Sequence, residues 1–306
     1  MRLAVDIGAT KTAFGIFDDA HKMAHRAEEP TATDDWKGLA DTVVSNIAKI
    51  ENRYQLVGSI GVSIAGTIDP RDGIASCANI PSISGRNLGD DLGQLLGRKV
   101  LIRNDAECLA LAEATHGAGR HYRQVFAIIL GSGIGGAIVT DGRLLSGATG
   151  QIGEWGHGNR IDHLVALHNL NSRACGCGRR NCLDLFGAGL GMANIHEDLS
   201  ATRSTAREIL SSWHSGNAAA TKTVDTFIEI VSSQLVLAIN VIDPEIVPVA
   251  GGLSNDTELV AALDEATRTK SLGQIDRPLI VPAENSVHGC LLGASLLGGD
   301  SVGNTS

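Results

Sequence analysis

Residues 125–144 read VFAIILGSGIGGAIVTDGRL and carry the strongest fold signal in the chain. A β-rich run, Val125–Leu130, leads into a glycine segment, Gly131–Gly136, and a second apolar run, Ala137–Thr140, follows at once. The glycines match G-x-G-x-x-G, but a dinucleotide-binding motif requires a helix directly after them, and a strand follows here. Asp141-Gly142 is a strong signal for a hairpin turn. We therefore predict strands joined by tight turns and reject a Rossmann unit.

The N-terminus repeats this arrangement. Arg2–Asp6 is an apolar run that ends on a carboxylate, Ile7–Thr12 is a Gly/Thr turn, and Ala13–Phe17 is a second apolar run. Strand, tight turn and strand is again the simplest prediction. Two similar halves, each with such a hairpin, would leave a cleft between two phosphate-contacting turns.

The halves are expected to meet near residue 118. This gives an N-terminal lobe of residues 1–118 and a C-terminal lobe of residues 119–288, with a helix at about 289–300 packed back on the N-terminal lobe. Other elements follow from hydrophobic spacing. They are a helix at 36–50 capped by Thr33 or Asp34, strands at Gly58–Ile64 and Val100–Ile102, a helix at Ala106–Thr115, a buried helix at Val224–Val241 and a strand at Glu245–Ala250. Pro248 suits an edge or a bulge better than a central strand.

Composition excludes several classes of protein. Of the 306 residues, 43% are hydrophobic and 19% are charged, which excludes intrinsic disorder. The net charge of -9 gives no electrostatic reason to bind nucleic acid or anionic lipid. We find no run of about 18 apolar residues without charge, and no signal peptide, so no membrane partner is expected. Cysteines gathered in one region, rather than spread as a disulfide framework, favour a reducing cytoplasm.

The strongest chemical signal is Cys175-x-Cys177-x₄-Cys182. Thiolates and imidazole are the usual ligands of structural Zn²⁺, and three Cys with one His fill a tetrahedral site. His157 lies upstream, and His163 and His168 are rival fourth ligands because both lie closer to the cysteines. The alternative is three unrelated buried thiols.

Both hairpin turns are candidate phosphate sites. Backbone N–H groups of Gly131–Gly136 could face a phosphate, or the segment could be a structural turn. In the N-terminal turn, the carboxylate of Asp6 suits water-mediated Mg²⁺ binding, Gly8 lets the backbone approach a phosphate, and Thr10 and Lys11 add donors. The alternative is a surface hairpin with a solvated lysine.

Asn104-Asp105 lies where a strand ends and a helix begins, which is where α/β proteins usually bind ligands. An aspartate there can accept the proton of a substrate hydroxyl that attacks a phosphoryl group. The alternative is helix capping by Asn104 or Asp105.

Taken together, these segments resemble the ROK family of bacterial sugar kinases and transcriptional repressors. The resemblance spans most of the chain in family order. The matching motifs are Asp6–Lys11, Asn104–Ala106, Gly131–Gly136, Gly153–His157, Cys175–Gly178 with Cys182, and Gly251–Ser254. Within the family, Asn79–Gly85, Asn104–Glu113 and Asp243–Asn255 favour N-acetyl-D-glucosamine as the substrate.

The resemblance implies an α/β, actin-like (ribonuclease H-like) ATPase fold with two lobes, ATP and sugar in a central cleft, and a structural zinc site. It implies that Asp105 is the general base. The sugar-binding positions it implies are Gly66, Asn79, Ser84, Gly85, Asn104, Asp105, Glu154, His157 and Asp184. The positions implied for ATP and Mg²⁺ are Asp6, Gly8, Ala9, Thr10, Lys11, Gly131, Ser132, Gly133, Gly135, Gly136, Gly251 and Gly252. The implied zinc ligands are His157, Cys175, Cys177 and Cys182.

Three positions depart from the family pattern. Ser132 replaces a common Thr and keeps the hydroxyl. Asp184 replaces a Glu that contacts the anomeric side of the sugar, and it is one methylene shorter. Trp155 stands where a smaller apolar residue is common.

The expected activity is ATP-dependent phosphorylation of the 6-hydroxyl of N-acetyl-D-glucosamine. Glucose, N-acetylmannosamine and fructose are alternative substrates within the same family. A sugar-sensing repressor is the alternative from another class, but the Asp6 motif leaves no room ahead of it for a helix-turn-helix, and the chain is acidic. The resemblance also implies a homodimer.

Overall fold

The structure is a computed structural model that describes residues 1–158 and 161–298. The chain forms two compact units, each made of segments that are not contiguous in sequence. The first unit comprises Met1–Thr115, Val139–Ile152 and the chain from Val287 onward. The second comprises His116–Ile138 and Gly153–Ser286. The sequence suggested a boundary near residue 118 and a return of the C-terminal helix to the first lobe, and in the structure Val139–Ile152 also belongs to the first unit.

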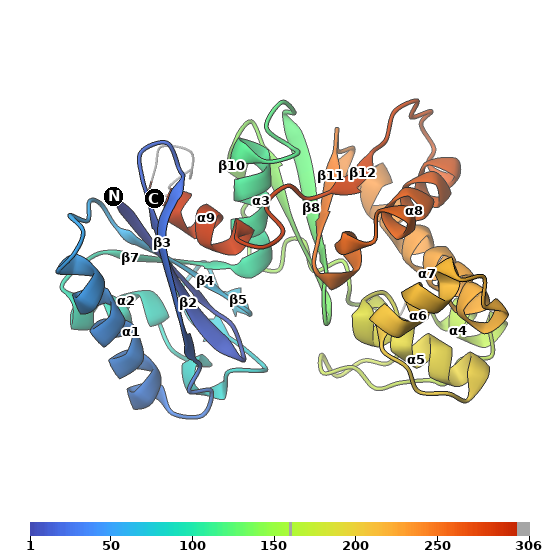
Figure 1. Cartoon of the computed structure of the whole chain (residues 1–306), viewed down its shortest axis with the longest axis horizontal. Coiled ribbons are helices and arrows are strands. Elements are labelled where there is room, and N and C mark those ends of the chain that lie inside the picture. Colours follow the sequence, from blue (N-terminus) through green and yellow to red (C-terminus); the bar gives the residue numbers. More distant parts are fainter. Residues whose placement is uncertain (159–160, 299–306) are drawn as a thin grey trace. The chain divides into compact units, whose positions relative to one another are not determined.

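The first unit is built on a five-stranded sheet in the order β3-β2-β1-β4-β7 (Figure 1). The predicted N-terminal hairpin is confirmed, because β1 and β2 pair antiparallel from Arg2–Phe17 to Ile7–Thr12. β4 and β7 continue the sheet in parallel. The strands are β1 (Arg2–Ile7), β2 (Lys11–Phe17), β3 (Met23–Pro30), β4 (Ile60–Ile64) and β7 (Val100–Asn104).

Helices cover both faces of this sheet. Along β1, Leu3, Val5 and Ile7 belong to one core with residues of α1 (Trp36–Glu51) and α2 (Leu88–Leu96). Ala4 belongs to the other core, with residues of α3 (Asp105–His116) and α9 (Gly289–Leu296). This alternation follows from the two-residue period of a strand.

Two expectations about helix ends differ from the structure. The N-cap of α1 is Asp35, without a side-chain capping bond, while the Thr33 hydroxyl donates to Asp34. The expected cap at Thr33 or Asp34 is therefore wrong. α9 ends at Leu296, and residues 299–300 of the expected helix lie outside the described residues.

A second five-stranded sheet has the order β10-β9-β8-β11-β12. Its strands are β8 (Gln124–Leu130), β9 (Ile134–Thr140), β10 (Arg143–Leu144), β11 (Val247–Ala250) and β12 (Ile280–Pro282). The Asp141-Gly142 turn is confirmed, with φ of 51° and 73° at its two residues. These positive values are those of the hairpin turn that Asp-Gly favours.

Pro248 is not at an edge, because β11 lies between β8 and β12. The edge prediction is wrong for a local reason. On the β8 side, Val249 and Ala250 pair with Ile128 and Ile129, and Ile246 forms an isolated bridge with Val125. The ladder is therefore interrupted beside Pro248, whose nitrogen has no hydrogen to donate.

The second unit also contains a helical layer around α7 (Ala218–Ile242). α7 packs against α5 (Gly189–Ser200), α6 (Ala206–His214) and α8 (Thr257–Lys270). By length and composition α7 could cross a membrane, contrary to what we expected of the sequence. Half of its most apolar 18-residue window is buried inside the protein, and its neighbours cover that face. We therefore describe α7 as the central helix of the second unit.

Candidate active site

The first unit holds the predicted acid–base candidate at the junction of β7 and α3. Ala106 N–H donates to Asn104 Oδ1 at 2.8 Å, and Asn104 N–H donates to Glu107 Oε2 at 3.1 Å. The Asn104 side chain thus caps the first turn of α3, the role that the sequence left open, and the Glu107 side chain bonds back to the Asn104 backbone. Asp105 is the first residue of α3 and is partly exposed. Its Oδ1 accepts from Ala106 N–H at 2.8 Å.

Several predicted sugar-binding residues are connected to this junction. Asn104 Nδ2 donates to Gly66 O at 2.8 Å, and a Cβ on Gly66 would lie 2.1 Å from Cys77 Sγ. The Ser84 hydroxyl accepts from Cys77 N–H and donates to Cys77 O, both at 2.8 Å. Burial, and then the charge of Asp105, raises the pKa of the Cys77 thiol to about 11.

The loop between β6 (Ala75–Ser76) and the short helix η1 (Pro81–Ile83) carries Asn79, which is exposed. Gly85 follows η1 with φ of 79°, and its N–H donates to Ala75 O at 2.9 Å. The structure therefore brings Gly66, Ser84, Gly85 and Asn104 together around Cys77, with Asn79 on the same loop.

The N-terminal turn combines one unusual carboxyl group with one paired lysine. Burial raises the pKa of Asp6, although Ser63, Lys11 and Arg26 oppose that shift. Gly8 N–H donates to Lys11 O at 3.0 Å and closes the turn. Lys11 Nζ lies 2.7 Å from Glu28 Oε1, and both side chains are largely exposed. In this structure the lysine is therefore paired with Glu28 on the surface of the hairpin, whereas the alternative interpretation expected a solvated lysine.

The second unit contains a cavity of about 420 Å³. Three glycines from different loops line it, namely Gly131, Gly189 and Gly252. Gly189 N–H donates to Gly131 O at 2.8 Å, and a Cβ on Gly251 would lie 2.7 Å from Gly131 N. The structure thus brings the predicted residues Gly131, Gly251 and Gly252 together.

Most of the other residues that line this cavity were not predicted from the sequence. They come from α6 and from η3 (Gly252–Asn255) with the residue after it: Ala206, Arg207, Leu210, Ser211, Leu253, Asn255 and Asp256. Two signals could have located them. Thr205-x-x-Glu208 is a capping box that starts α6, and Asn255-Asp256 directly follows the second glycine motif.

The remainder of Gly131–Gly136 is contacted by side chains. Asp184 Oδ1 accepts from Ile134 N–H at 2.7 Å, and Trp155 Nε1 donates to Gly135 O at 3.1 Å. Ser132 is exposed. Asp184, expected to contact sugar, therefore has one oxygen bonded to the glycine segment.

The three cysteines and His157 form a compact group, the Cys/His cluster. Their ligand atoms all lie within 4.8 Å of one another. Cys175 Sγ is 3.6 Å from His157 Nδ1, and Cys177 Sγ is 3.5 Å from Cys182 Sγ. A backbone hydrogen bond from Arg179 lowers the pKa of Cys177 to about 6, and burial raises that of Cys182 to about 12. The alternative of three unrelated buried thiols is wrong.

The structure also distinguishes His157 from the two other candidates for the fourth ligand position, His163 and His168. His168 Nε2 lies 3.0 Å from Glu229 Oε2, and His163 is exposed on α4 (Asp162–Leu167). His157 turns Nδ1 to the cluster and holds Nε2 3.7 Å from Glu154 Oε2. Burial raises the pKa of Glu154 above its usual value. The charge of His157 opposes this shift, and the charge of Asp184 adds to it.

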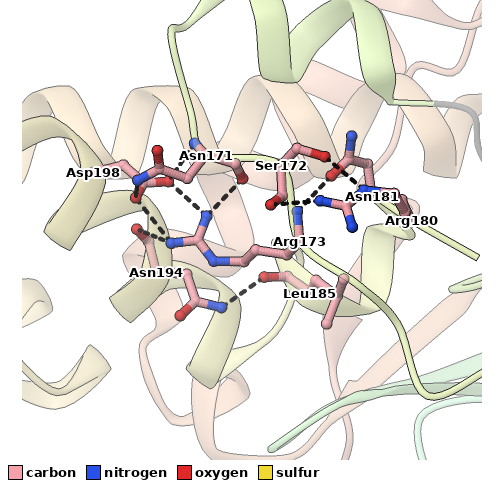
Figure 2. Close-up of polar contacts among 8 residues, drawn as sticks. All are labelled: Asn171, Ser172, Arg173, Arg180, Asn181, Leu185, Asn194 and Asp198. Atoms are coloured by element: carbon pink, nitrogen blue, oxygen red, sulfur yellow. Dashed lines mark hydrogen bonds and ion pairs between the residues drawn. The ribbon is translucent and has the colours of Figure 1, made fainter.

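A network of hydrogen bonds joins α5 to the loop that carries the three cysteines of the Cys/His cluster (Figure 2). Arg173 donates from Nη1 and Nη2 to the two carboxylate oxygens of Asp198, at 2.6 and 2.9 Å. Asn171 N–H donates to the same carboxylate at 2.9 Å. Asn181 pairs with the backbone of Arg173 in both directions, at 2.8 and 2.9 Å. The segments just before Cys175 and Cys182 are thereby tied to each other and to the helix.

Comparison with known proteins identifies close relatives along the whole chain. A family model described as the ROK family matches residues 2–300. N-acetyl-D-glucosamine kinase of Pasteurella multocida (strain Pm70) is 33% identical over 300 residues, covering 97% of this chain and 99% of that protein. N-acetylgalactosamine kinase AgaK of Shewanella sp. (strain ANA-3) is 32% identical over 298 residues, covering 97% and 96%. The crystal structure of a ROK hexokinase from Thermus thermophilus matches with a TM-score of 0.83 at 28% identity, covering 97% of each chain.

Proposed function

The chain belongs to the ROK family, and on that premise we propose that it transfers a phosphoryl group from ATP to the 6-hydroxyl of N-acetyl-D-glucosamine. It is an ATP-dependent sugar kinase with the actin-like fold of its family. The observation that supports N-acetyl-D-glucosamine as the substrate is the full-length match, at 33% identity, to an N-acetyl-D-glucosamine kinase. Because another relative of similar identity acts on N-acetylgalactosamine, that sugar is the main rival.

Asp105 is the proposed general base. Asp105 lies at the start of α3 and is partly exposed, and the bonds of its neighbour Asn104 with Ala106 N–H and with Glu107 Oε2 fix the backbone on either side of it. A carboxylate there would accept the proton of the attacking hydroxyl and favour the nucleophilic form of the sugar. The proposed sugar contacts in the same unit are Asn79, Ser84, Gly85, Gly66 and Asn104.

The cavity lined by Gly131, Gly189 and Gly252 is the proposed site of the nucleotide. Its volume of about 420 Å³ lies within the usual range for small-ligand pockets. The proposed phosphate contacts are Gly8–Lys11 and Gly131–Gly136. Asp6 would hold Mg²⁺, since a cation beside it would offset the burial that raises the pKa of its carboxyl group. The ion would neutralise phosphate charge during transfer.

The Cys/His cluster fits a structural zinc ion. Zinc–ligand bonds of about 2.3 Å to sulfur and 2.1 Å to nitrogen give tetrahedral edges of about 3.8 Å between sulfurs and about 3.6 Å between sulfur and nitrogen. The observed separations of 3.5 Å and 3.6 Å are close to these edges. Cys175, Cys177, Cys182 and His157 Nδ1 would hold the ion, which would stabilise three neighbouring thiolates. The bond through Nδ1 would orient the His157 ring, with Nε2 directed to the sugar beside Glu154.

Six free cysteines support our further proposal that the protein works in the cytoplasm. We also propose that the protein forms a homodimer, as the family resemblance implies.

A coupled ADP-release assay with Mg-ATP tests the substrate. The panel comprises N-acetylglucosamine, N-acetylgalactosamine, N-acetylmannosamine, glucose, fructose and a blank without sugar. We expect kcat/KM to be highest for N-acetylglucosamine by about tenfold, equivalent to about 1.4 kcal/mol of transition-state preference. A higher kcat/KM for another sugar would show that the substrate assignment is wrong, but the proposed kinase mechanism would stand. If no sugar stimulates ADP release, the proposed kinase function is itself wrong.

A further inference from the structure

The glycine segment Gly131–Gly136 forms one hydrogen bond with each of two arms of the Cys/His cluster, the residues just before His157 and those just after Cys182. Ile134 N–H donates to Asp184 Oδ1 at 2.7 Å, and Asp184 lies two residues after Cys182. Trp155 Nε1 donates to Gly135 O at 3.1 Å, and Trp155 lies two residues before His157. The two side chains therefore hold two peptide groups of one short segment, Gly133–Ile134 and Gly135–Gly136, which are separated by a single peptide group.

Close packing at both positions shows why glycine is needed there. A Cβ on Gly133 would lie 2.7 Å from Asp184 Oδ1, and a Cβ on Gly136 would lie 2.9 Å from Trp155 Cδ1. Separations below about 3 Å would force the carboxylate and the indole away from the segment. Two of the glycines in the G-x-G-x-x-G pattern thus make room for the side chains that hold the backbone.

The supporting arms are themselves fixed. Asp184 N–H donates to Gly156 O at 2.9 Å, which ties the two arms to each other. The Trp155 ring packs edge-on against Phe126 of β8, with centroids 6.2 Å apart. The backbone of Asp184 and the ring of Trp155 are thus each held by a contact outside the segment.

We propose that Asp184 and Trp155 are positioning residues that hold Gly131–Gly136 in the conformation that receives the phosphates of the nucleotide. This inference rests on the proposed kinase function. It assigns Asp184 to nucleotide binding in place of the sugar contact that the family resemblance implied, and the observation behind this assignment is the bond from Ile134 N–H to Asp184 Oδ1. Backbone donors that are held in place before binding lose less freedom when the phosphate arrives, which strengthens binding.

The test measures the affinity for Mg-AMPPNP, a non-hydrolysable ATP analogue, by titration calorimetry of the zinc-loaded protein. Asp184→Ala is expected to bind it about tenfold more weakly, the value of about one net hydrogen bond. Asp184→Asn keeps an acceptor oxygen and is expected to stay within about threefold of wild type. KM for the sugar is expected to change by less than about twofold in both. Zinc content is measured in every sample.

Glu245→Ala is the matched control. Glu245 is also a carboxylate that accepts backbone N–H bonds, from Arg123 and Gln124, but these lie at the other end of β8. Its Kd for Mg-AMPPNP should equal that of wild type. If Asp184→Ala does not fold, Trp155→Phe provides the second test. It keeps the ring, removes the donor to Gly135, and is expected to bind the analogue about fivefold more weakly.

Three results would overturn the inference. The first is an unchanged Kd for Mg-AMPPNP in Asp184→Ala, or in Trp155→Phe where that variant is used. The second is a raised sugar KM with unchanged nucleotide affinity, which would return Asp184 to the sugar. The third is weaker binding that appears only together with loss of zinc. Wild-type protein that binds no Mg-AMPPNP would instead refute the proposed kinase function, and the two failures are therefore distinguishable.

Discussion

Asp198→Ala should destabilise the second unit by about 3 kcal/mol. The Asp198 side chain is 2% exposed and that of its partner Arg173 is 20% exposed. Its carboxylate accepts two bonds from Arg173 and one from Asn171 N–H, at 2.6, 2.9 and 2.9 Å, and a fourth from Asn171 Nδ2. Removing one partner of a buried ion pair costs about 3–5 kcal/mol. We expect the lower end, because the guanidinium keeps some solvent, a bond to Asn171 O and its packing over Phe186.

Urea unfolding followed by tryptophan fluorescence provides the assay. A Trp36→Phe background leaves Trp155 and Trp213 as probes, and both belong to the second unit. With a slope of about 3 kcal/mol per molar, the midpoint should fall by about 1 M urea. Glu284→Ala is the control, because it breaks an ion pair with Arg120 in the same unit that is 43% and 52% exposed. Exposed pairs contribute about 0–1 kcal/mol.

The same variant should affect metal affinity and acid stability. Burial raises the pKa of Asp198, but the bonds from Arg173 and Asn171 outweigh it and hold the pKa below 3.8. The stabilisation is therefore present above about pH 4 and is lost as the pH falls through the lowered pKa. Loosening the segments beside Cys175 and Cys182 should weaken zinc binding by about 10–100-fold. A midpoint shift no larger than that of Glu284→Ala would refute this reasoning.

Three further results are expected. Asp105→Asn should lower kcat by about a thousandfold with an unchanged far-UV circular dichroism spectrum, and wild-type turnover would remove Asp105 as the base. Cys177→Ser should lower bound zinc, measured by elemental analysis, from about one per chain to a small fraction, whereas Cys290→Ala, outside the Cys/His cluster, should retain it. A hydrogen bond to Asp256 raises the pKa of His214 above 6.5, so its stabilisation is full below that pH and is lost as the pH rises through the raised value. The difference in Tm between wild type and His214→Gln should therefore be larger at about pH 5.5 than at about pH 9, and an equal difference at both would contradict the assignment.

Local sequence signals predicted several of the elements and the grouping of the three cysteines with a histidine. The antiparallel β1–β2 pair, the Asp141-Gly142 turn and α1 were all expected from residue pattern. So was the Cys/His cluster, since ligand type and short spacing are written in the chain itself. The choice of His157 over His163 and His168 was not decided by spacing from the cysteines. It required the fold, which turns His168 toward Glu229.

Pairwise contacts between distant segments were beyond the sequence. Nothing in residues 125–144 indicates that the carboxylate of Asp184 bonds to Ile134 N–H, 50 positions away. Likewise, the cavity walls from α6 and η3 follow from how separate helices pack. The misplacement of Pro248 has the same origin. Its missing N–H favoured an edge or a bulge, and in the structure an interrupted ladder beside β8 accommodates it inside the sheet.

The sequence by itself determined the family, the hairpins and the grouping of the three cysteines, because these depend on residue types and on spacings of a few positions. Only the tertiary structure decided what the glycines of Gly131–Gly136 are for. Gly133 and Gly136 are small because Asp184 and Trp155 lie against them, whereas Gly131 faces the cavity. The distinction depends on which side chains converge from remote parts of the chain, and that is a property of packing rather than of local pattern.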